Sequence, residues 1–213
     1  PTQIKIQKGQ FLLPFFFIYN KNFFRDILYL SNMERNKYIN IKKSSNFLIV
    51  GTTRNCEMSL KQSFDKLKSS IGEVKKIQFL FIESDSNDDT KNVLKELSIK
   101  NENFHYVCLG SLIKKYPLRT QRLAFCRNVY VKEIRENNKY KNVNYVVVSD
   151  LDNINDCLNT TSFESCWERN DWDMCSANQL GVYYDMFALR HKTWMPYDYK
   201  ILYKSLKKKK SKV

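Results

Sequence analysis

The chain has 213 residues, and its 36 Lys and Arg against 22 Asp and Glu give a net charge of +14. Hydrophobic residues make up 43% of the sequence, which excludes a disordered or collagenous chain because enough apolar surface is available to offset the ordering entropy. With only 5 Gly and 4 Pro, an all-β sandwich is disfavoured as well, because such a fold needs more turn residues.

Residues 1–45 show no clear periodicity, and we expect them to form an N-terminal extension. Their apolar run, Phe11–Tyr19, is much shorter than the about 20 residues that a membrane span needs. No small-residue cleavage site of a signal peptide follows it. We therefore expect a docked N-terminal element, with a signal or anchor segment as the alternative. The compartment is left open between the cytoplasm and the lumen of the secretory pathway.

Strand-like and helix-like segments alternate from residue 46 onward. Short apolar runs predict buried strands at 46–51, 77–83, 104–109 and 144–150. Apolar residues at helical spacing predict helices at 58–72, 88–98 and 119–138, the first of them stopped by Gly72. This alternation predicts an α/β fold, in which a mostly parallel central sheet is flanked by helices.

Polar residues concentrate in the loops that follow the predicted strands. In a parallel sheet, ligands bind beyond the carboxyl ends of the strands. The loops after Gly51, Glu83 and Ser149 are therefore expected to face one cleft.

Two aspartates, Asp150 and Asp152, follow the last predicted strand in the sequence VVVSDLDN. Because the strand opens into a loop there, both carboxylates can point at one cation. Mg²⁺ and Mn²⁺ prefer oxygen ligands and readily share them with a diphosphate. The pattern predicts a divalent-metal site, and the alternative is a polar loop closed by an Asx turn.

The strand at 77–83 is followed by the acidic sequence ESDSNDDT. Glu83 lies at the strand tip, where a carboxylate can accept hydrogen bonds from a ribose or a base, and Asp85 is close behind it. Asp88 and Thr90 are typical of helix caps and turns, so we expect a structural role for them.

Three arginines, Arg119, Arg122 and Arg127, lie in the first half of the helix predicted at 119–138. Helix N-termini and Arg side chains both favour phosphate. Arg119 and Arg127 lie within about 80° of each other around a helix of about 3.6 residues per turn, whereas Arg122 is turned toward another face. The alternative is an exposed basic helix face.

These motifs, in this order, resemble those of a GT-A-fold glycosyltransferase: a strand ending in VGTTRN, a strand followed by ESDSNDDT, a helix with LAFCRN and a strand ending in SDLD. The closer likeness is to the fungal capsule-associated α-1,3-mannosyltransferase family and related viral domains. The later stretch DMCSANQLGVYYDMFALR resembles that family's aromatic-Tyr-Asp sequence before a strand ending in Arg. The likeness implies a single Rossmann-like GT-A domain, which we place at residues 46–200.

The resemblance implies a hexosyltransferase-type enzyme that takes a UDP- or GDP-sugar as donor and a glycan or glycoprotein as acceptor. The donor-binding residues that it implies are Thr52, Thr53, Arg54 and Glu83 against the nucleoside, and Arg127 and Asn128 near the diphosphate. Arg119, from its position at the start of the helix, is a further candidate phosphate contact. Asp150 and Asp152 would bind Mn²⁺ or Mg²⁺ and, through it, the diphosphate. Many members of the family have Asn-Asp where this chain has a full D-x-D.

The chemistry of glycosyl transfer assigns further candidates. The departing diphosphate must be neutralised, and a divalent ion and Arg side chains can do this. An inverting enzyme also needs a carboxylate base, for which Asp185 is the first candidate and Asp173 the second. If the enzyme retains configuration, these carboxylates hold donor-sugar hydroxyls instead. GT-A enzymes often recruit a C-terminal His as a metal ligand, which makes His191 a candidate, with a surface or packing role as the alternative.

Other functions compete with this prediction. A basic nucleic-acid-binding module would suit the positive charge, but the acidic loops would repel a phosphate backbone, so we expect no nucleic acid as partner. A nucleotidyltransferase would normally have a Gly-rich loop after the first strand, whereas GTTRNCE holds one Gly. An inactive transferase domain is a further alternative. The lysine-rich residues 201–213 are expected to be a basic tail, or a linker to an additional domain.

The 6 cysteines contain no C-x-x-C pair, which disfavours a structural zinc site. Cys108 and Cys126 lie in apolar patterns and are expected to be buried free thiols. Cys157, Cys166 and Cys175 are able to form a bridge if the protein resides in an oxidising lumen.

Overall fold

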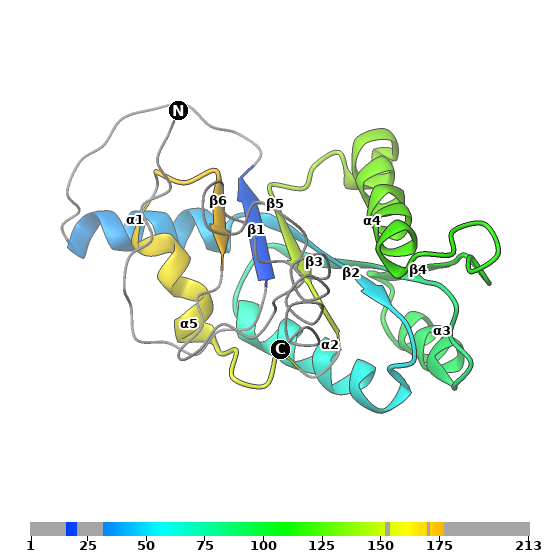
Figure 1. Ribbon diagram of the computed structural model, residues 1–213. Helices are drawn as coiled ribbons and strands as arrows, with labels where there is room; N and C mark the ends of the chain where they lie inside the picture. The colour runs from blue at the N-terminus through cyan, green and yellow to red at the C-terminus, as the bar shows by residue number, and fades with distance from the viewer. Residues whose placement is uncertain (1–15, 21–31, 152–153, 170, 177–213) are drawn as a thin grey trace, which may run out of the picture. The chain divides into compact units, whose positions relative to one another are not determined.

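A computed structural model describes residues 16–20, 32–151, 154–169 and 171–176. The chain divides into two compact units, Pro1–Asn178 and Gln179–Val213, and all described residues belong to the first. Strands of this unit form one sheet in the order β4-β3-β2-β5-β1-β6 (Figure 1). Their bounds are β1 Phe16–Asn20, β2 Asn46–Thr53, β3 Lys76–Glu83, β4 Phe104–Cys108, β5 Tyr145–Ser149 and β6 Met174–Ser176.

The strands predicted from the sequence form the parallel part of this sheet. β2 pairs in parallel with β3 on one side and with β5 on the other, and β4 pairs in parallel with β3. β1 pairs antiparallel with β5, from Phe16↔Ser149 to Asn20↔Tyr145, and also antiparallel with β6. The predicted α/β fold with a mostly parallel sheet is confirmed, and part of the expected N-terminal extension adds a strand to it.

Helices cover both faces of the sheet. Their bounds are α1 Asn32–Lys43, α2 Glu57–Ile71, α3 Thr90–Lys100, α4 Arg119–Glu136 and α5 Thr160–Glu164, with the short 3-10 helices η1 Asn138–Tyr140 and η2 Ser165–Glu168. Successive strand residues face opposite sides of the sheet. Phe47 and Ile49 of β2 therefore pack with residues of α2, α3 and α5, whereas Leu48 and Val50 pack with residues of α4 and η1. Among the described residues, no helix has both the length and the apolar character that crossing a membrane requires.

The helix ends follow the predicted signals. Gly72 ends α2 with a φ of 68°, a left-handed conformation that glycine adopts without strain. Before α3, the Asp88 carboxylate accepts hydrogen bonds from Thr90 N–H at 3.1 Å and from Glu57 N–H at 3.2 Å. The structural role expected of Asp88 and Thr90 is therefore confirmed.

The cysteines in the described residues are free thiols. Cys126 is buried, as predicted, but Cys108 is exposed, because it ends the edge strand β4. Cys166 and Cys175 interact through a thiol hydrogen bond, which raises the pKa of Cys166 and lowers that of Cys175. The structure thus places two of the three cysteines considered for a bridge in contact, while Cys157 is exposed.

Candidate functional site at the carboxyl edge of the sheet

The loops after β2 and β3 lie against each other at the carboxyl edge of the sheet. The backbone N–H of Asn55 donates to Ser86 Oγ at 3.0 Å, and Arg54 Nε donates to the Asp85 carbonyl at 3.3 Å. Asn87 N–H donates to Asn55 Oδ1 at 3.0 Å. The sequence predicted that these loops converge, because parallel neighbouring strands end at the same edge.

The D-x-D sequence is anchored by the residue between its two aspartates. The Leu151 side chain is buried, and its carbonyl accepts a hydrogen bond from Ser59 Oγ of α2 at 3.0 Å. A Cβ at Gly51 would lie 2.6 Å from the Ser149 carbonyl oxygen and 2.9 Å from Leu151 Cδ1. Gly51 of β2 therefore provides the space in which Leu151 packs.

A buried asparagine, Asn155, holds the backbone of the same turn. Its Nδ2 donates to the Asp150 carbonyl at 2.8 Å, and its Oδ1 accepts from Ser149 Oγ at 3.0 Å. Only 1% of Asn155 is exposed. Sequence reasoning missed this residue, because an Asn in a polar loop gives no sign of being buried.

Asp150 follows β5 and lies beside Arg127 of α4. Arg127 Nη2 and Asp150 Oδ1 are 3.8 Å apart, and the two side chains are 47% and 49% exposed. At this distance and exposure, the pair contributes little to stability and remains open to solvent. Asn128 is exposed one residue further along α4, and Arg119 is exposed at the first residue of the helix.

Glu83 does not lie open at the strand tip as predicted. Its side chain is fully buried, and its Oε1 accepts a hydrogen bond from Ser86 N–H at 2.9 Å. Partial desolvation at the edge of the sheet, and then the negative charge of the Glu83 carboxylate, raise the pKa of the neighbouring Cys108 thiol. Glu83 therefore shapes the loop after β3, and contact with a base or ribose would first require it to become exposed. Thr53 is likewise buried, whereas Thr52 is half-buried.

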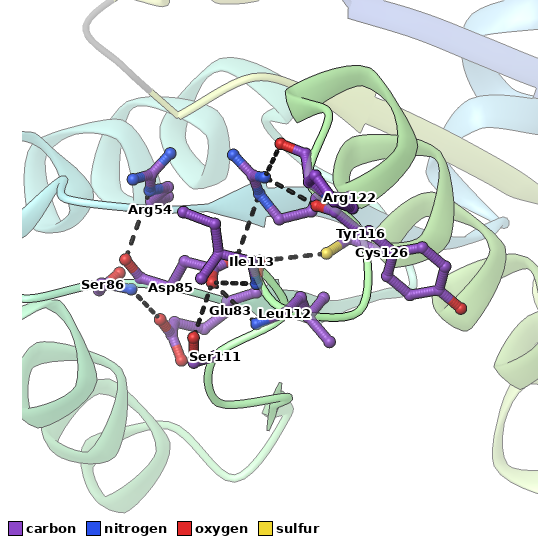
Figure 2. A network of polar contacts seen from close by, with 12 residues as sticks. Arg54, Glu83, Asp85, Ser86, Ser111, Leu112, Ile113, Tyr116, Arg122 and Cys126 are labelled. Atoms are coloured by element: carbon purple, nitrogen blue, oxygen red, sulfur yellow. Dashed lines mark hydrogen bonds and ion pairs between the residues drawn. The ribbon is translucent and has the colours of Figure 1, made fainter.

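Asp85 and Arg122 form the centre of a buried polar network (Figure 2). Asp85 Oδ1 accepts from Leu112 N–H at 2.8 Å and from Ile113 N–H at 3.2 Å, and Arg122 Nε lies 3.5 Å from Asp85 Oδ2. Burial raises the pKa of Asp85, but the hydrogen bonds from Leu112 and Ile113 and the Arg122 charge outweigh it, so that the pKa lies below its ordinary value.

Arg122 also fixes the segment before α4. Its Nη1 donates to the carbonyls of Tyr116 and Pro117, both at 2.8 Å (Figure 2). The sequence assigned Arg122 to a different helix face from Arg119 and Arg127, and the structure agrees, because Arg122 is buried whereas the other two are exposed. Its pairing with Asp85 could not be predicted, since it joins residues 37 positions apart.

The remaining candidates are only partly described. Asp173 is exposed directly before β6. Asp152, Asp185 and His191 lie outside the described residues. The described residues contain no group of three His, Cys, Asp or Glu side chains able to hold a metal ion. Of the predicted ligands, Asp150 alone is described, and its partly exposed carboxylate at the sheet edge fits one ligand of a hard divalent cation.

Comparison with protein-family models gives no match, and a search of curated proteins likewise finds no relative. The candidate site is therefore defined by its residues and their positions in the fold.

Proposed function

We propose that the protein is a glycosyltransferase of the GT-A type, which transfers a sugar from a nucleoside-diphosphate sugar to a hydroxyl acceptor with the help of a divalent cation. The main support is the position of Asp150 beside Arg127, 3.8 Å apart, directly after a parallel strand in the middle of the sheet. Ligands of open α/β sheets bind at this edge.

The charges at this edge suit a departing diphosphate. Arg127 presents a half-exposed guanidinium, and Arg119 adds a second exposed cation at the N-terminus of the same helix. Both the helix N-terminus and the arginines stabilise negative charge. When bound, Mn²⁺ or Mg²⁺ would neutralise the diphosphate as it leaves.

The proposed ligand set combines one described residue with residues assigned from the sequence. Asp150 would bind the cation, together with Asp152 and, as a third ligand, His191. Asp185 or Asp173 would act as the base that takes the proton of the acceptor hydroxyl, or would hold the donor sugar if configuration is retained.

The loop after β2 is the proposed binding region of the nucleoside. Arg54 is exposed there, and its Nε bond to the Asp85 carbonyl keeps the side chain over the edge of the sheet (Figure 2). Thr52 is half-buried near the end of β2, just before this loop. Glu83 would support this loop indirectly rather than contact the nucleoside itself. Its carboxylate accepts from Ser86 N–H in the loop after β3, and Ser86 Oγ accepts from Asn55 N–H in the loop after β2.

Thermal-shift measurements with UDP-, GDP- and dTDP-sugars, with and without Mn²⁺, test the proposal. We expect one nucleotide class to raise the melting temperature by about 5 °C at saturating concentration, and only when Mn²⁺ is present. The free sugars and Mn²⁺ alone are the controls. If no nucleotide sugar stabilises the protein beyond these controls, and none is hydrolysed, the proposal is wrong.

A further inference from the structure

The segment between β4 and α4 exposes two large aliphatic side chains. Ile113 is 52% exposed and Leu118, five positions further along the chain, is 61% exposed. Single exposed aliphatic residues are common on protein surfaces. Here, however, the two side chains flank two exposed lysines, Lys114 and Lys115, and are followed by the exposed Arg119. We call residues 113–119 the basic-apolar loop.

The basic-apolar loop is held in place from the inside of the protein. At the start of the loop, the Asp85 carboxylate accepts hydrogen bonds from the backbone N–H groups of Ile113 and of Leu112 just before it. Near the end of the loop, Arg122 donates to the carbonyls of Tyr116 and Pro117 (Figure 2). Because the backbone is fixed at both ends, little ordering entropy remains to be lost when the exposed side chains bind a partner.

The charged side chains in and around this loop in the sequence are positive. From Asn103 to Lys132 the chain contains no Asp or Glu, whereas it contains six Lys and Arg. Three of these lie beside carboxylates within the protein: Arg122 beside Asp85, Arg127 beside Asp150 and Lys132 beside Glu136. Lys114, Lys115 and Arg119 remain at the surface of the loop, and the complementary partner is therefore anionic.

A single-stranded nucleic acid and an anionic bilayer both bind cations, but they differ in the other side chains that they require. A single-stranded nucleic acid binds best where exposed aromatic rings stack on its bases. In this loop the aromatic ring is already in contact with other side chains. Tyr116 packs against Phe125 in a tilted arrangement, with ring centroids 4.9 Å apart, and Lys115 Nζ lies over both rings. Aliphatic side chains among lysines are instead typical of segments that enter the interface of an anionic bilayer.

We propose that the basic-apolar loop docks the protein on an anionic lipid bilayer, with Ile113 and Leu118 in the interface and Lys114 and Lys115 among the head groups. The inference goes beyond the proposed function and does not depend on it. If both hold, the docking surface belongs to the connection between β4 and α4, the helix that carries Arg127.

Vesicle co-sedimentation of the full chain tests this proposal. The vesicles consist of phosphatidylcholine, with and without about 30% of the anionic lipid phosphatidylserine. The wild type is expected to bind only the anionic vesicles. The double variant I113S/L118S should bind at least tenfold more weakly, because it loses two aliphatic side chains from the interface while every charge is retained. Since the lysine-rich tail is unchanged in this variant, the tail cannot account for the loss.

Matched variants on α3 and α2 separate the loop from general surface effects. I99S and M58S remove side chains that are 74% and 87% exposed, and they should bind within twofold of the wild type. The affinity of K114E/K115E for anionic vesicles should fall at least tenfold. The affinity of K91E/K95E, which has the same net charge, should fall much less. Circular dichroism and melting curves check that each variant is folded.

Three results would overturn the proposal: no binding of the wild type to anionic vesicles, equal binding by I113S/L118S, or an equal loss in the variants on α3 and α2. Binding of single-stranded RNA that is unaffected by I113S/L118S, without vesicle binding, would identify a nucleic acid as the partner instead. If I113S/L118S loses vesicle binding but still binds the nucleotide sugar like the wild type, the membrane proposal is supported independently of the proposed function.

Discussion

At the scale of single residues, Asn155 determines the backbone conformation at the candidate metal site. Its side chain is buried, and both ends of its amide are hydrogen-bonded. Nδ2 donates to the Asp150 carbonyl at 2.8 Å, and Oδ1 accepts from Ser149 Oγ at 3.0 Å. Leu151, between these contacts in the chain, is fixed by α2 through the Ser59 hydroxyl. The direction in which the Asp150 carboxylate points therefore depends on a side chain five residues away.

Asn155→Ala should consequently lower both stability and metal affinity. The loss of two buried hydrogen bonds is expected to cost about 1–3 kcal/mol of unfolding free energy. Mn²⁺ binding in the presence of a nucleoside diphosphate, followed by electron paramagnetic resonance, should weaken about tenfold, as is typical when a residue that orients a metal ligand is removed.

Asn159→Ala is the matched control, because Asn159 caps α5 through Ser162 N–H at 2.8 Å and has no bond to Asp150 among its described contacts. It should cost about 1 kcal/mol of stability without changing Mn²⁺ affinity. Equal Mn²⁺ affinity in both variants and in the wild type would show that Asn155 has a structural role only. If the wild type binds no Mn²⁺, the proposed metal site itself is absent.

The residues that sequence reasoning placed well are those whose environment follows from position in a strand. Asp150 comes directly after an apolar run, so its location at the carboxyl edge could be predicted. Glu83 ends a similar run but is fully buried, because the loops after β2 and β3 close over it through contacts between residues 31 or 32 positions apart. Such contacts leave no local pattern in the sequence.

At the scale of elements, the connection between β4 and α4 depends on the Asp85 carboxylate. Asp85 receives two backbone hydrogen bonds from this connection and lies 3.5 Å from Arg122. Its pKa is below the ordinary value, so the unfolded state binds the proton more strongly than the folded state. Asp85 therefore contributes stability at neutral pH, and this contribution is lost as the pH falls below the pKa of aspartate in the unfolded chain.

Asp85→Asn should remove this pH dependence. At pH 7 the variant is expected to be about 1–3 kcal/mol less stable than the wild type in urea unfolding, because an amide accepts the backbone bonds less strongly and cannot pair with Arg122. At pH 3 the difference should shrink. Asp65→Asn, at an exposed position of α2, controls for the loss of a carboxylate. A difference that stays constant between the two pH values would contradict this account.

The elements themselves were predictable where a pattern repeats locally. Alternating apolar strands and helices at 46–150 appear in the structure with the expected types and order. β1 was not predicted, because its place depends on pairing with β5, from Phe16↔Ser149 onward, far along the chain. Antiparallel addition of a strand at the edge of a parallel sheet has no signature in the strand's own residues.

At the scale of the whole molecule, a basic chain presents carboxylates as well as arginines at the carboxyl edge of its sheet. The net charge of +14 favours anionic ligands, while the residues at the carboxyl edge include carboxylates that would repel them. In the proposed function, a divalent cation would resolve this conflict, because it would bind the carboxylates and the ligand phosphates together. Cation and nucleotide sugar should therefore bind cooperatively.

Calorimetry of nucleotide-sugar binding with and without Mn²⁺, for the wild type and Asp150→Asn, tests this claim most directly. Asp156→Asn is the control, since Asp156 is an exposed carboxylate six residues along the chain that accepts from Gln62 Nε2 at 3.3 Å. We expect Mn²⁺ to strengthen binding at least tenfold in the wild type and in Asp156→Asn, and to have no effect in Asp150→Asn, whose melting temperature should remain close to that of the wild type. A full Mn²⁺ enhancement in Asp150→Asn would contradict the proposed site.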